Sequence, residues 1–142
     1  MTFIEALYGS QYREITQNGK DGAKGRLNGN IFLSVFIVLI AIVILMILIK
    51  GLDGLNNDLT KFVQRFFGNG RNAGKTVGKL LAIPLFAFIY LIISKTIGNK
   101  ANYEKIIERF NNLPEEVQKQ ANKKILIPFF IFLGILMFTA LF

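Results

Sequence analysis

Three long stretches of the chain are almost purely apolar, and polar residues fill the segments between them. These stretches are residues 31–50, 80–98 and 125–142. None alternates apolar and polar faces as a helix of a water-soluble protein does. At about 1.5 Å per residue, 18 to 20 helical residues extend about 27–30 Å, close to the thickness of a bilayer core. The pattern predicts an all-α integral membrane protein with three transmembrane helices.

The same pattern divides one domain into six segments. We expect an N-terminal amphipathic segment with a basic, glycine-rich linker (1–30), the first span (31–50), an outer loop with an amphipathic helix (51–79), the second span (80–98), a cytoplasmic helical hairpin (99–124) and the third span (125–142).

Short amphipathic helices are expected at the N-terminus and in both loops, resting at the membrane surface. The N-terminal stripe is expected to break at Gly9, and residues 18–30 to form a flexible basic link. The stripe consists of Phe3, Ile4, Leu7, Tyr8 and Tyr12.

The first loop carries apolar residues at spacings of three and four, which favours a helix with one apolar face. That face either lies on the membrane surface or packs on a partner protein, and the sequence leaves both alternatives open. Its members are Leu55, Leu59, Phe62, Val63, Phe66 and Phe67.

The second loop predicts a hairpin of two helices. Ile106 and Phe110 share a face of the first helix, which should stop near Asn111. Pro114 suits the first turn of a second helix, which we expect to run on into the third span and to bend at Pro128.

Charge indicates how the chain is threaded. The net charge is +8 and the mean hydropathy is +0.44. Eleven lysines and arginines lie on the side shared by the N-terminus and the second loop, against six on the other side. The positive-inside rule therefore predicts a cytoplasmic N-terminus and a C-terminus at the outer face of a bacterial inner membrane. Since the first thirty residues hold neither a long apolar stretch nor a small-residue cleavage site, we expect the first span to be an uncleaved anchor. The basic flanks suit anionic lipid head groups rather than nucleic acid.

The residue types argue against an active site. Cysteine, histidine and tryptophan are absent, which excludes thiolate and imidazole chemistry. We expect no catalytic residue, metal or cofactor. Lys95, near the end of the second span, either extends to the cytoplasmic head groups or pairs with an acidic residue of a partner.

The stretch 68–76, GNGRNAGKT, approaches a phosphate-binding loop. Asn69 stands where the pattern requires its first glycine, and an amphipathic helix replaces the preceding strand. We interpret the stretch as a turn whose lysine meets lipid phosphates, and we expect no nucleotide binding.

The second span carries small and polar residues, which makes it the best candidate to face protein. The candidates for contact with a partner or with lipid are Leu59, Phe62, Phe66, Phe67, Ala82, Ala87, Tyr90, Lys95, Ile106 and Phe110.

By elimination, the sequence favours a non-catalytic accessory or scaffold subunit of a multi-subunit inner-membrane complex, such as an energy-transducing motor or a secretion or transport machine. Its partners would be other integral membrane subunits. The alternative is a holin-like or small pore-forming protein that acts as a homo-oligomer.

Overall fold

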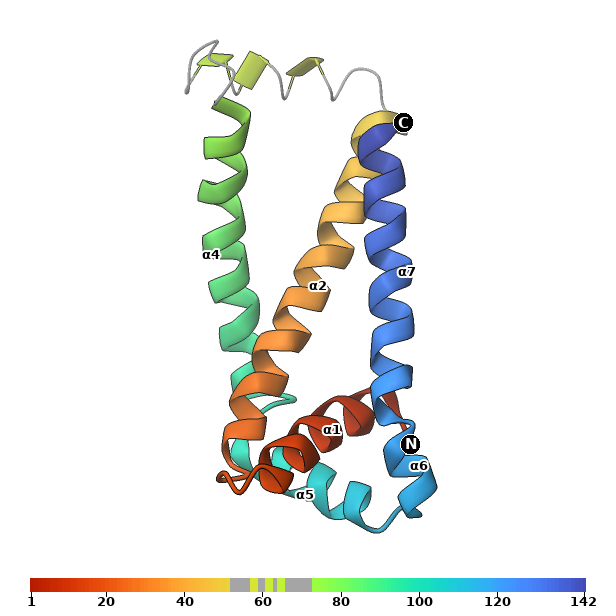
Figure 1. The fold of residues 1–142 in the computed structure, drawn as a ribbon. Helices are drawn as coiled ribbons and strands as arrows, with labels where there is room; N and C mark the ends of the chain where they lie inside the picture. The colour runs from red at the N-terminus through yellow and green to blue at the C-terminus, as the bar shows by residue number, and fades with distance from the viewer. Residues whose placement is uncertain (52–56, 59–60, 63, 66–72) are drawn as a thin grey trace.

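The computed structural model describes residues 1–51, 57–58, 61–62, 64–65 and 73–142. Every regular element in these residues is helical (Figure 1). The helices are α1 (Phe3–Gln17), α2 (Lys24–Gly51), α4 (Ala73–Lys95), α5 (Lys100–Asn111), α6 (Glu115–Lys119) and α7 (Ala121–Leu141).

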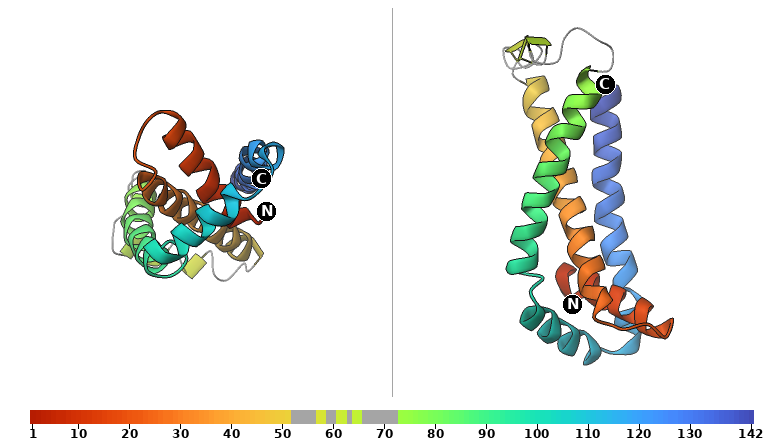
Figure 2. Two further views of the ribbon diagram at one scale, coloured as in Figure 1. Left: turned by 90° about the horizontal axis from the view of Figure 1, so that it is seen from below. Right: turned by 90° about the vertical axis from the view of Figure 1, so that its left-hand side faces the viewer.

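Three long helices stand upright, and the shorter ones form a base at one end. α2 packs on both α4 and α7. α1 and α5 cross beneath them, and α6 connects α5 to α7 (Figure 2). We call α1, α5 and α6 the basal platform. Because α1 packs on α2, α5 and α7, it holds segments together that are far apart in the sequence.

Two helical segments are long and apolar enough to cross a membrane, namely Lys24–Leu48 and Glu115–Leu141. A third candidate arises if Leu80–Lys95 and Lys100–Asn111 form one span, although they are bent by 70° relative to one another. The described residues thus contain two or three candidate spans. For the described residues, the predicted helical class is confirmed, and their two or three candidate spans are consistent with the predicted helical membrane protein.

Among the described residues, the best-packed part is the junction between the platform and the feet of the long helices. Ala6, Leu7 and Phe110 are completely buried there. They belong to a cluster with Leu33, Ile93, Ala121 and Ile125. Farther from the platform, the long helices expose most of their apolar side chains, such as Phe138 at 65%.

The N-terminal segment differs from the prediction. α1 continues through Gly9, and α2 begins at Lys24, seven residues before the predicted span, so the flexible link is much shorter than expected. The glycines are sites of close helix contact instead. A Cβ atom on Gly9 would lie 2.2 Å from Cγ of Phe110, and one on Gly29 would lie 2.4 Å from Cδ1 of Tyr8. The packing energy of these crossings outweighs the weak helix propensity of glycine.

The hairpin follows the predicted bounds at its start and departs from them at its end. α5 ends at Asn111, and Pro114 precedes α6. The predicted run of the second helix into the third span is interrupted at one residue, because α6 stops at Lys119 and α7 starts at Ala121, although Glu115–Leu141 together form one candidate span. The amide of Gln120 donates a 3.2 Å hydrogen bond to the carbonyl of Val117, three residues back, which tightens the turn between them.

Candidate functional site

The start of α1 is fixed by a capping box. The Thr2 hydroxyl accepts a hydrogen bond from the Glu5 amide, and the Glu5 carboxylate accepts one from the Thr2 amide at 2.8 Å. The second bond lowers the pKa of Glu5. This arrangement satisfies backbone donors that would otherwise be unpaired at the helix end, and it sets where α1 begins to cross under the long helices.

A buried polar junction joins α1, α2 and the turn between α4 and α5. The Tyr8 hydroxyl donates a 2.6 Å hydrogen bond to Oδ1 of Asn30, and Nδ2 of Asn30 donates to the Gly98 carbonyl at 3.3 Å. Tyr8 is completely buried and Asn30 is 2% exposed. Burial raises the pKa of Tyr8 to about 12, so its hydroxyl remains a donor at neutral pH.

Tyr103 of α5 extends this junction. Its ring meets the ring of Tyr8 edge to face, with centroids 5.8 Å apart. Its hydroxyl donates a 2.7 Å hydrogen bond to the carbonyl of Gly22 in the link before α2. Burial raises the pKa of Tyr103 to about 12 as well. Two tyrosines therefore hold α1, α5 and the start of α2 in one arrangement.

A groove of about 700 Å³ lies beside this junction, between the link, the foot of α2 and α5. Its lining includes the cations Arg26 and Lys100, the carboxylates Glu104 and Glu108, and Tyr12. None of the four charged groups forms an ion pair with a described residue. The groove offers charges of both signs for binding a ligand. Among the described residues, no group of three or more carboxylate, imidazole or thiolate side chains is placed to hold a metal.

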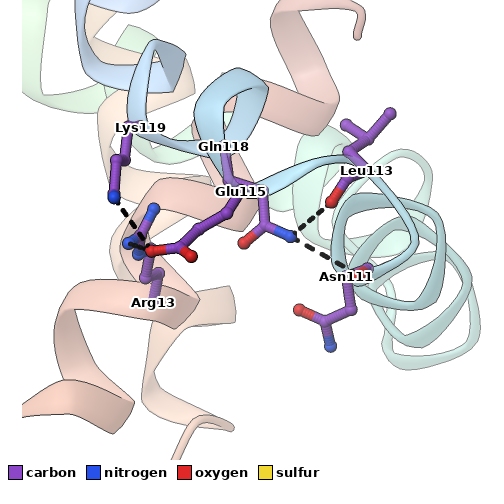
Figure 3. A network of polar contacts seen from close by, with 6 residues as sticks. All are labelled: Arg13, Asn111, Leu113, Glu115, Gln118 and Lys119. Carbon is purple, nitrogen blue, oxygen red and sulfur yellow. Dashed lines mark hydrogen bonds and ion pairs between the residues drawn. The ribbon is translucent and has the colours of Figure 1, made fainter.

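The other side of α1 carries a small ionic network (Figure 3). Glu115 of α6 lies 3.0 Å from Lys119 and 3.6 Å from Arg13 of α1. The hydrogen bond from Lys119 lowers the pKa of Glu115. Gln118 donates a 2.8 Å hydrogen bond to the Leu113 carbonyl, closing the turn before α6. These contacts are largely exposed, so they set the geometry of the platform more than its stability.

Those predicted contact residues that the structure describes do not gather into one site. Phe110 is completely buried against Gly9, so its side chain is no contact surface for a partner or lipid, contrary to the prediction. Ile106 is half-buried at the edge of the platform. Phe62 is 56% exposed. Leu59, Phe66 and Phe67 lie outside the described residues.

The candidates of the second span lie along α4. Ala82 and Tyr90 are half-buried, whereas Ala87 and Lys95 are exposed. The ring of Tyr90 stacks on that of Phe86, with centroids 6.2 Å apart. Of the glycine-lysine stretch, residues 68–72 lie outside the described part of the chain and 73–76 form the start of α4.

Comparison of the chain with protein-family models, with curated proteins and with solved structures gives no match. The interpretation of the site therefore rests on its own geometry.

Sequence reasoning missed the polar junction. Asn30 and Gly98 sit at the edges of predicted spans, and residues 18–30 have the composition of a link. One signal was available: Asn30 and Ser34 are four residues apart, a spacing that places two polar side chains on one helical face.

Proposed function

We propose that this chain is a three-span protein of a bacterial inner membrane and a non-catalytic accessory or scaffold subunit of a multi-subunit complex. The N-terminus and the basal platform would lie in the cytoplasm, near anionic lipid head groups, and the end of α7 at the outer face. Candidate complexes are an energy-transducing motor and a secretion or transport machine.

The third span in this proposal is α4 alone. α4 has 23 residues, which extend about 34 Å, enough to cross a bilayer core. α5 is less suited to the membrane because it is amphipathic and buries Tyr103, Ile107 and Phe110 in the platform. Its other face carries charged side chains, which are costly in lipid.

The observation that carries the proposal is the position of α4. This helix packs on α2, and the Asn30–Gly98 hydrogen bond fixes the turn at its foot. Ile83 and Leu91, which share a helix face with Ala87, are nevertheless 69% and 55% exposed. A firmly held helix with a free apolar surface and small residues on it supports docking against another membrane subunit.

Purification in mild detergent tests the proposal. We expect other membrane proteins to co-elute with this chain at a fixed ratio. Ala87→Phe should release them, because a bulky ring at a small residue prevents close helix approach. Leu81→Phe, on another face of α4, is the matched control and should leave the complex intact.

Two outcomes would contradict the scaffold assignment. A ring containing only this chain would favour the pore-forming alternative. Equal recovery of every co-purifying protein with Ala87→Phe and with Leu81→Phe would remove α4 as the docking surface.

A further inference from the structure

A second groove, of about 310 Å³, lies where α1 passes beneath α2 and α7. We call it the α2–α7 groove. It is lined by Gln11, Asn28, Ile31, Phe32, Val35 and Phe129, which come from these three helices.

The lining of the α2–α7 groove changes from polar to apolar along α2. Asn28, Ile31 and Val35 follow at spacings of three and four, so they share one face of the helix. Ile31 and Val35 are 41% and 43% exposed. Gln11 of α1 adds a second amide to the lining. No hydrogen bond joins either side-chain amide to a described residue, and Lys24 stands one turn before Asn28 on the same face.

Packed phenylalanine rings lie behind the apolar part of the groove. The rings of Phe32 and Phe129 lie with their centroids 5.5 Å apart, and Phe36 packs behind them, 6.4 Å from Phe129. Phe3 of α1 stacks on Phe36 at 5.4 Å. The aromatic cluster therefore fills the space between α2 and α7 behind the groove.

We propose that the α2–α7 groove binds one glycerophospholipid, with an acyl chain against Ile31, Val35 and Phe129 and the phosphate end near Lys24, Asn28 and Gln11. This inference rests on the membrane location proposed above. Ile31 begins the apolar run of α2, and Asn28 lies about 4.5 Å before it along the helix axis. The lining of the groove thus changes from hydrogen-bonding to apolar side chains within a few ångströms, as a phospholipid changes from its head group to its acyl chains. Water in the groove would leave its apolar side chains exposed to a polar solvent. An apolar partner helix would cover both amides without giving them a hydrogen-bond partner.

The absence of tryptophan from the chain gives a direct test. Phe129→Trp places the single tryptophan of the chain in the groove. Phe130→Trp places one on the neighbouring residue of α7, which is 60% exposed and does not line the groove. Each variant is titrated in mild detergent with phosphatidylglycerol that carries brominated acyl chains, which quench tryptophan on contact. Each is also reconstituted in vesicles of the brominated lipid alone.

In detergent, we expect half-maximal quenching of Phe129→Trp at a lipid-to-detergent ratio several-fold below that needed for Phe130→Trp, because the groove retains phospholipid in preference to detergent. Adding Gln11→Leu and Asn28→Leu to Phe129→Trp should shift its quenching curve onto that of Phe130→Trp. An unchanged circular dichroism spectrum would show that the helices persist.

Coincident curves for Phe129→Trp and Phe130→Trp would overturn the lipid site and leave the membrane location standing. Quenching of Phe130→Trp alone would also overturn the lipid site, and it would assign the groove to a protein segment. Absence of quenching in both variants, even in fully brominated lipid, would overturn the membrane location as well.

Discussion

The Tyr8 hydroxyl and the Asn30 side chain meet at 2.6 Å in the interior of the chain, and the same asparagine reaches the Gly98 carbonyl. One side chain thus joins a helix of the platform, a long helix and the turn at the foot of another. A buried polar group of this kind is valuable only while all its partners are present.

Tyr8→Phe should lower the free energy of unfolding by about 1–3 kcal/mol, because Oδ1 of Asn30 is left buried without its donor. Thermal or denaturant unfolding in mild detergent, followed by circular dichroism, measures the loss. Tyr12→Phe is the matched control, since the Tyr12 hydroxyl makes no hydrogen bond with a described residue. Equal stabilities of the two variants would contradict the role of the junction.

Gly9→Ala should destabilise the chain by about 1–3 kcal/mol, since the added methyl group overlaps the buried Phe110 ring. Gly134→Ala is the comparison: no other group lies within 4 Å of a Cβ there, and alanine favours a helix by up to about 1 kcal/mol. Combining Gly9→Ala with Phe110→Leu should recover part of the loss. If Gly9→Ala were as stable as Gly134→Ala, the close crossing of α1 and α5 would be wrong.

Stability should fall at alkaline pH through Tyr8 and Tyr103. Both phenols have a pKa of about 12 in the folded chain, against an ordinary value of 10.0. The unfolded chain therefore releases these protons first. Their contribution is complete below pH 10 and is lost as the pH rises through 12. The free energy of unfolding, measured across this pH interval, should decline less steeply in the Tyr8→Phe, Tyr103→Phe double variant than in the unmodified chain. Identical pH profiles would contradict the assignment.

Reporter fusions test the proposed orientation. A reporter that works only in the cytoplasm should be active when fused before Met1. One that works only outside the inner membrane should be active after Phe142. The opposite pattern would place the basal platform outside the cytoplasm and exchange the roles of the two loops.

Sequence reasoning succeeded where local signals decide the structure. Asn111 and Pro114 end one helix and precede the next because backbone preferences act within a few residues. The uninterrupted apolar runs likewise indicated the long helices. Such features do not depend on what the rest of the chain contacts.

Sequence reasoning failed where distant segments meet. Gly9 looked like a helix break because the sequence does not show that Phe110 fills the space a side chain would need. Asn30 looked like the end of a link because its partners, Tyr8 and Gly98, are 22 and 68 residues away. The α2–α7 groove was missed for the same reason, since its lining comes from three helices.

The contacts of α1 also impose an order on the folding of the protein during its synthesis. α1 is synthesised before the other described helices, yet it packs on α7, and the Met1 carbonyl accepts a hydrogen bond from Lys124, 123 residues later. Until α7 has been made, the residues of α1 that pack on α7 lack that contact, although α2 and α5 are already present. The basal platform therefore takes its complete form only after α7 has been synthesised.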